Sequence, residues 1–144
     1  MSFEEHFKKL TTMYLNAATN RYYDPVITIG KGTAEIEIAV KPEFFHSAGT
    51  VHGSVYFKLL DDAAYFAASS AITDAHLVTA SFNLYFLRPI SLGTMKGIGT
   101  LVHRSQRLII AEAKVLDDKG KIAASGSGAF MKTDIPLDGK VGYC

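Results

Sequence analysis

The stretch from Gly53 to Ser70 constrains the fold more than any other part of the sequence. After Gly53 it contains neither proline nor glycine, so no residue in it would interrupt a helix. Such a helix would be apolar nearly all round, through Val55, Tyr56, Phe57, Leu59, Leu60, Ala63, Ala64, Tyr65, Phe66, Ala67 and Ala68. It is too short and too charged for a membrane span, which needs about 20 apolar residues, and must be buried inside its own protein.

The segments around this helix predict antiparallel β structure. Val26 to Ile29 and Thr33 to Val40 flank the loop Gly30-Lys31-Gly32 and should form a hairpin. Four further strands are expected after the helix, at residues 77–87, 94–103, 107–116 and 121–132. A sheet curled around the central helix is the simplest packing that buries the helix on all sides, so we expect an α+β fold.

Two glycine pairs, Gly97 with Gly99 and Gly126 with Gly128, each occupy one face of a predicted strand. Glycine at alternate strand positions weakens a strand unless another backbone must come close. The central helix lying across the sheet would explain both pairs.

The two ends of the chain extend this single domain of residues 1–144. Residues 1–24 should contain an amphipathic helix, because Ser2 and Glu5 have capping-box spacing. Its apolar face is expected to comprise Phe3, Phe7, Leu10, Tyr14, Leu15 and Ala18. Residues 134–144 are expected to form a loosely held tail.

Charge and cysteine content limit the partners and the compartment. Fifteen Lys and Arg against fourteen Asp and Glu give a net charge of +1, with no basic cluster for nucleic acid. The only cysteine is Cys144, so no intrachain disulfide can form, which fits a reducing compartment. The N-terminus is acidic and no apolar leader follows it. We therefore expect a cytoplasmic protein without nucleic-acid or membrane partners.

The loop that enters the central helix carries the most informative motif. It reads Gly49-Thr50-Val51-His52-Gly53-Ser54, and Asp61 follows eight residues after Gly53. This arrangement resembles the hotdog-fold acyl-CoA thioesterases of the PaaI-type branch, whose motif Gly-x-x-His-Gly-Gly opens the central helix, with a catalytic Asp two turns later. The resemblance extends from about residue 26 to residue 132. His46 stands where the family usually has Asn, and Ser54 where a second Gly is common.

The resemblance implies an acyl-CoA thioesterase that forms a homodimer, or a homotetramer, with shared active sites. CoA would arrive as part of the substrate, and no separate cofactor or metal is expected. Thr79 would help to hold the attacking water, or it is an ordinary strand threonine. His46 would donate a hydrogen bond as a neutral imidazole, as Asn does, or it packs in the loop.

Physical chemistry supports roles for the motif residues independently. Free N–H groups at a helix N-terminus can stabilise a developing oxyanion, and Gly53 would let an acyl group approach them, unless it only eases the entry turn. His52 could orient the substrate or cap the helix. Asp61 lies within an otherwise apolar helix, where burial favours a general-base role. The alternative for Asp61 is an ion pair with Lys58. For Asp62 we expect this ion pair with Lys58, as an exposed pair.

Basic residues could bind the CoA phosphates, and Arg88, Arg104 and Arg107 are the main candidates. A solvated surface charge is the alternative for each. The second functional interpretation is a non-catalytic acyl-CoA-binding or regulatory protein of the same fold, which the His46 departure favours and Asp61 opposes. A hydratase of this fold would need motifs that the sequence lacks.

Overall fold

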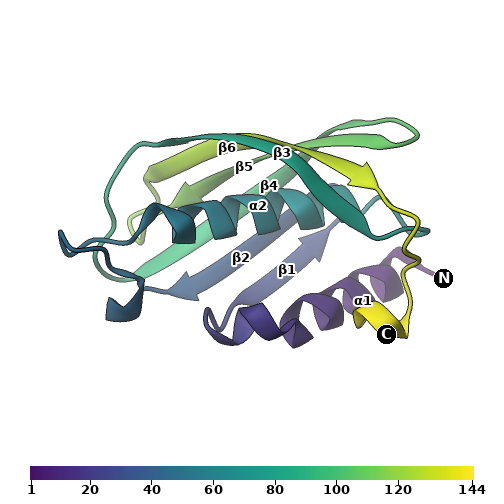
Figure 1. Cartoon of the computed structure of the whole chain (residues 1–144), viewed down its shortest axis with the longest axis horizontal. Helices are drawn as coiled ribbons and strands as arrows, with labels where there is room; N and C mark the ends of the chain where they lie inside the picture. The colour runs from purple at the N-terminus through teal and green to yellow at the C-terminus, as the bar shows by residue number, and fades with distance from the viewer.

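A computed structural model describes residues 1–144, and a single antiparallel sheet dominates it (Figure 1). The six strands lie in the order β1-β2-β4-β5-β6-β3, and every neighbouring pair is antiparallel. Their bounds are Val26–Gly30 (β1), Thr33–Ala39 (β2), Leu77–Phe86 (β3), Thr94–Arg104 (β4), Leu108–Leu116 (β5) and Ile122–Lys132 (β6). The predicted strands are therefore confirmed to within one or two residues, and β1 and β3 form the two edges of the sheet.

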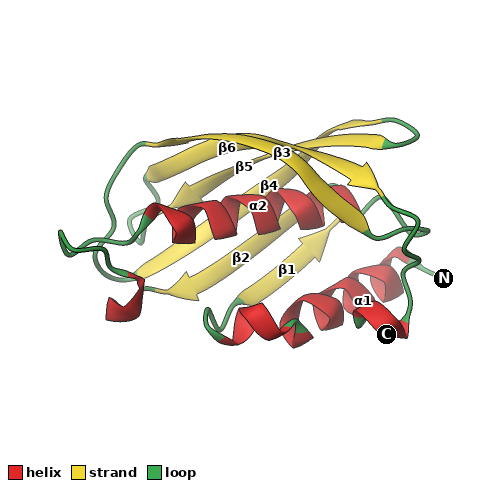
Figure 2. Ribbon diagram, viewed as in Figure 1, coloured by secondary structure: helices red, strands yellow, loops and turns green.

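The central helix α2 (Gly53–Ser69) lies across this sheet, as Figure 2 shows. Its Leu59, Leu60, Ala63, Ala64 and Ala67 are at most 1% exposed and belong to the main hydrophobic core. The confirmed prediction follows from the sequence pattern, because a helix with apolar residues all round can only be stable when it is covered.

Glycines in β4 allow α2 to approach the sheet closely. A Cβ on Gly97 would lie 2.9 Å from the carbonyl oxygen of Leu59, and one on Gly99 would overlap the carbonyl group of Ala63. The prediction is confirmed for this pair. It is wrong for Gly126 and Gly128, whose neighbours are residues of β3, chiefly the ring of Phe82, and for Gly128 also Phe130 of β6. That pair makes room for an aromatic side chain on the neighbouring strand instead of the helix.

The N-terminal helix α1 (Phe3–Asn16) lies alongside β1, and the short 3-10 helix η1 (Ala18–Arg21) follows it (Figure 1). The capping box of Ser2 and Glu5 is present as predicted. The predicted apolar face is partly wrong, because Phe3 and Leu15 are exposed whereas His6 and Met13 are buried. Relative to the predicted face, the helix is rotated so that His6 contacts Tyr143 and Ser69. The spacing of apolar residues within the helix carries no information about such distant contacts.

The C-terminal tail (residues 134–144) is held against α1, contrary to the expected loose extension. It includes the short 3-10 helix η3 (Gly139–Val141), and Tyr143 after it is only 6% exposed. Another 3-10 helix, η2 (Pro42–Phe44), precedes the loop that leads into α2. Both ends of the chain therefore lie at one end of the molecule (Figure 1), near the C-terminal end of α2.

Candidate functional site

Asp61 and Thr79 are joined by a hydrogen bond and line the same cavity. The Thr79 hydroxyl on β3 donates a 2.8 Å hydrogen bond to Oδ1 of Asp61 on α2. Burial raises the pKa of Asp61; the bond from Thr79 opposes this rise, and the nearby charge of Asp62 adds to it. A carboxylate with a raised pKa is a stronger base, so Asp61 is suited to accept a proton from water.

Asp62 forms the expected ion pair with Lys58, but the pair is largely buried in a polar network, so the expected exposure is wrong. Its Oδ2 lies 2.7 Å from Nζ of Lys58 and accepts a 2.7 Å hydrogen bond from the Tyr14 hydroxyl. The Asp62 and Lys58 side chains are only 14% and 18% exposed. Burial and the Asp62 charge raise the pKa of Tyr14, which keeps its hydroxyl protonated as a donor. Sequence analysis missed Tyr14 as a site residue, because it comes from α1.

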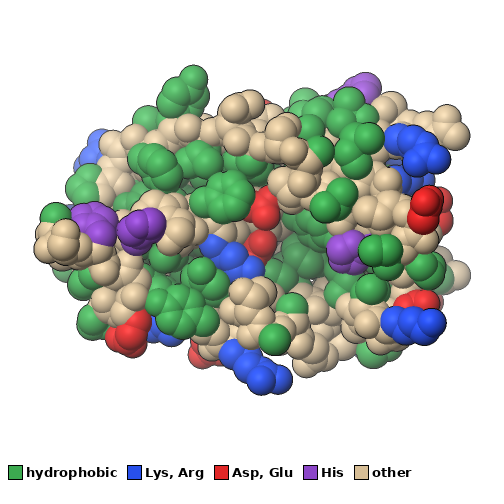
Figure 3. Space-filling view, in the orientation of Figure 1, with side chains coloured by type: hydrophobic (Ala, Val, Ile, Leu, Met, Phe, Trp, Pro, Cys, Tyr) green, Lys and Arg blue, Asp and Glu red, His purple; other side chains and the backbone are tan.

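A cavity of about 690 Å³ contains both carboxylates and opens on the face shown in Figure 3, where acidic and basic side chains lie at the bottom of a hollow. Tyr65 lies one helical turn after Asp61 and also lines this cavity, together with His76. The Tyr65 hydroxyl donates to the Leu77 carbonyl at 2.8 Å and lies 3.2 Å from Nε2 of His76. Burial lowers the pKa of His76. The four-residue spacing from Asp61 to Tyr65 places both on one face of the helix, whereas no local pattern in the sequence indicates His76.

Gly53 and His52 lie at the N-terminal end of α2. Nδ1 of His52 accepts the Ser54 N–H at 3.0 Å, so His52 caps the helix. The protein supplies no acceptor for the Gly53 N–H, which leaves this group free to bind an oxyanion. A Cβ on Gly53 would lie 2.9 Å from the exposed ring of Phe86. A larger residue at position 53 would therefore displace the Phe86 ring at the start of α2.

His46 lies in the exposed loop before α2, with its ring centroid 6.5 Å from that of His52. Its Nδ1 accepts the Ala48 N–H at 3.1 Å, so in the neutral ring Nε2 carries the proton. Nε2 lies 2.8 Å from the Thr50 hydroxyl. The donor that was expected to replace the family Asn is therefore already engaged within the loop, and the hydrogen bond to Thr50 must open before it can reach a ligand.

The predicted catalytic residues fall into two groups within one protomer. His46, Gly53 and Arg88 line a second cavity of about 450 Å³, which shares no lining residue with the cavity of Asp61 and Thr79. Gly53 and Asp61 are eight residues apart on α2, which corresponds to about 12 Å of helical rise. One protomer therefore cannot bring both groups to the same carbonyl carbon.

The three candidate phosphate-binding arginines are also separated. Arg88 lines the cavity of Gly53, at the N-terminal end of α2. Arg104 pairs with Ile109, and the Arg107 carbonyl accepts the Lys132 N–H, so both lie at the opposite end of the sheet. Arg88 cannot bind the same CoA molecule as the other two within one protomer.

No group of three or more His, Cys, Asp or Glu side chains is arranged to hold a metal ion. None of the helices has the length and the apolar character needed to cross a bilayer.

Known proteins resemble this chain in sequence and in fold. The model of the thioesterase superfamily matches residues 48–124, which run from the loop before α2 into β6. A protein of Saccharolobus solfataricus named "Putative esterase" is 28% identical over 128 residues, covering 88% of this chain and 87% of its own. A protein of the same name from Mycobacterium tuberculosis is 28% identical over 102 residues, covering 68% and 73%.

The fold of this chain closely matches that of a solved structure, although the two sequences share little identity. The structure of the E. coli PaaI protein from the phenylacetic acid degradation operon superposes with a TM-score of 0.83 at 20% identity, covering 92% of this chain and 96% of that one. The prediction of a hotdog fold, with the sheet wrapped around a long helix, is thereby confirmed.

Proposed function

Because the chain belongs to the thioesterase superfamily, we propose that it hydrolyses acyl-CoA thioesters to a free acid and CoA, with Asp61 as general base or nucleophile. The observation that carries this proposal is the half-buried Asp61 carboxylate, which accepts a hydrogen bond from Thr79 beside a cavity large enough for an acyl group. The relatives named as esterases support hydrolysis as the reaction class.

In the general-base route, water attacks the thioester carbonyl carbon and Asp61 accepts its proton. A C–O bond forms, the oxyanion is stabilised by the free Gly53 N–H at the start of α2, and the C–S bond then breaks. The proton held by Asp61 passes to the departing CoA sulfur, which regenerates the carboxylate. Thr79 keeps one Asp61 oxygen occupied, so that the other oxygen can face water.

The distance along α2 supports a site shared between two protomers, as in the homodimer that the family resemblance implies. Gly53 of one protomer would provide the oxyanion donor and Asp61 of the second would provide the base. Strand β3 is an unpaired edge of the sheet, so it has backbone groups free for pairing with a second copy. Arg88 would then act on the Gly53 side of a shared site, and Arg104 and Arg107 at the far end.

A panel of acyl-CoA thioesters tests the proposal through release of the CoA thiol, and release of the free acid from oxygen esters of the same acyl groups serves as the comparison. We expect turnover of thioesters by the wild-type protein and a loss of roughly 10²–10⁴-fold in kcat for Asp61→Asn. Thr79→Val should retain binding with a smaller loss in kcat. Binding of acyl-CoA without any CoA release would contradict hydrolysis and favour the regulatory alternative.

A further inference from the structure

The cavity beside Asp61 is closed on one side by the two ends of the chain. Asp61 and Tyr65 on α2 line it, and so do Met13 of α1 and Val141 of the tail. We infer that the C-terminal tail, through Val141, sets the length of the acyl group that fits beside Asp61. This inference rests on the proposed function, because it assigns the cavity to the acyl part of the substrate.

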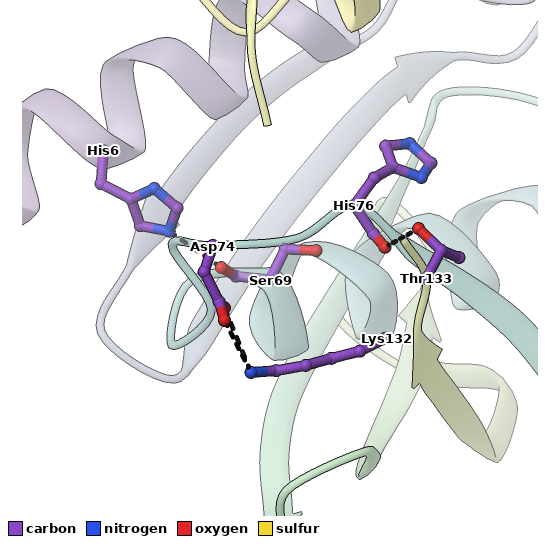
Figure 4. A network of polar contacts seen from close by, with 6 residues as sticks. All are labelled: His6, Ser69, Asp74, His76, Lys132 and Thr133. Carbon is purple, nitrogen blue, oxygen red and sulfur yellow. Dashed lines mark hydrogen bonds and ion pairs between the residues drawn. The ribbon is translucent and has the colours of Figure 1, made fainter. Parts of the chain in front are cut away.

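A buried hydrogen-bond chain holds the end of the tail in place. The Tyr143 hydroxyl lies 2.7 Å from Nδ1 of His6, and Nε2 of His6 lies 2.9 Å from the Ser69 carbonyl oxygen. A carbonyl can only accept, so Nε2 carries the proton and Nδ1 accepts from Tyr143. His6 is fully buried. The contact of His6 with Ser69 is shown in Figure 4 and ties α1 to the C-terminal end of α2.

The start of the tail is anchored separately to His76, the residue before β3. The Thr133 hydroxyl and N–H both donate to the His76 carbonyl, at 2.6 and 3.1 Å, and the first of these bonds is drawn in Figure 4. The His76 N–H in turn donates to the Ile135 carbonyl at 2.8 Å. The tail is therefore fixed at both ends, and the segment that lines the cavity lies between the two anchors.

Val141 is the apolar side chain in that segment, and it packs against the hydrophobic core while remaining partly exposed. Gly142 follows in the left-handed region, with φ of 82°, and a Cβ on it would lie 3.5 Å from the Met13 Cα. This turn brings the tail against α1 and holds Val141 at the cavity wall. A larger side chain at position 141 should therefore leave less space in the cavity for a ligand, and a smaller one should leave more.

Apolar side chains line the cavity together with the carboxylates, among them Met13, Phe66 and Val141. In this assignment an acyl group bound beside Asp61 extends towards Val141, and an acetyl group is too short to contact it. The ligand class is therefore an acyl chain or aryl acyl group of limited length, with the tail as its end stop.

Substitutions at position 141 test this inference with two readouts. The first is kcat/KM for acetyl-, hexanoyl- and dodecanoyl-CoA. The second is the dissociation constant of S-alkyl-CoA thioethers of the same lengths, which needs no hydrolysis. For the longest accepted chain, Val141→Phe should lower kcat/KM and raise the thioether dissociation constant by about tenfold. For the acetyl compound both values should stay within about twofold of the wild type. Val141→Ala should change the preference in the opposite direction, towards longer chains.

Ile135→Ala is the matched control, since Ile135 lies in the same tail, is exposed and does not line the cavity. An unchanged length profile in both Val141 variants, or an equal change in Ile135→Ala, would overturn the inference while hydrolysis stands. Thioethers that fail to bind would also overturn it. A shifted thioether profile in a protein that hydrolyses no thioester would support the inference and reject the proposed function.

Discussion

Replacing Gly99 by alanine tests whether the close contact between the sheet and α2 positions the candidate site. The added Cβ would overlap the carbonyl group of Ala63 and lie 2.8 Å from the Ala64 nitrogen. These are backbone atoms in the middle of α2, so no side chain can rotate away to make room. The helix would have to move away from β4.

The size of the effect follows from the neighbours of each glycine. Overpacking a core costs about 1–3 kcal/mol and occasionally more, whereas alanine in a strand gains roughly 0.5–1 kcal/mol over glycine when it fits. Gly99→Ala meets only rigid backbone, so we expect the free energy of unfolding to fall by about 3 kcal/mol. Gly97→Ala, with the Leu59 oxygen at 2.9 Å, should cost less. Gly139→Ala faces open space and should change stability by less than about 0.5 kcal/mol.

Urea denaturation at matched protein concentration measures the three variants, and thioester hydrolysis is then measured per folded molecule. Asp61 lies two residues before Ala63 on α2, so a displaced helix should pull its carboxylate away from Thr79 and lower kcat in Gly99→Ala even where the protein is folded. A Gly99→Ala protein as stable and active as the wild type would refute this reasoning, and so would a larger loss in Gly97→Ala.

Three further predictions concern the carboxylates and the assembly. Burial raises the pKa of Asp61, so its stabilising contribution is present at acid pH and is lost as pH rises through the folded-state pKa; Asp61→Asn should therefore increase the free energy of unfolding by about 0.5–2 kcal/mol near neutral pH and by less near pH 4, as urea melts at both pH values would show. Lys58→Met leaves the Asp62 carboxylate buried without its ammonium partner, so we expect a loss of about 2 kcal/mol. Because Lys58 lowers the pKa of Asp61, the acid limb of kcat/KM should also move to higher pH in this variant, and an unmoved limb would count against the coupling. Mixing inactive Gly53→Val and Asp61→Asn proteins should restore part of the activity through hybrid dimers, whereas mixed dimers seen by native mass spectrometry without activity would contradict the shared site.

Local pattern was sufficient to predict most of the fold. The apolar helix at α2 and the four strands after it follow from periodicities that neighbouring residues specify by themselves. The β4 glycines were explained correctly because a helix covering that strand was already expected. The rotation of α1 could not be predicted, since His6 is buried by Tyr143, which lies 137 residues later.

The candidate site divides in the same way. Asp61 was predicted because a carboxylate in an apolar helix is costly unless it is paired or used, and Thr79 was predicted from the family resemblance; their hydrogen bond brings the two side chains together. Tyr14 was missed because its bond to Asp62 joins residues 48 positions apart. The ion pair of Asp62 with Lys58 is present as expected, but the polar network that includes Tyr14 buries it. The wall formed by Val141 depends equally on the tertiary position of the tail.

The most direct test of the central claim separates binding from chemistry at Asp61. A nonhydrolysable S-alkyl-CoA thioether and the matching acyl-CoA should be given to the wild-type and Asp61→Asn proteins, with Asp134→Asn as an exposed control of the same chemistry. We predict thioether dissociation constants within about threefold for all three proteins, and a loss of roughly 10²–10⁴-fold in kcat for Asp61→Asn alone. An Asp61→Asn protein that releases CoA at the wild-type rate would contradict the account.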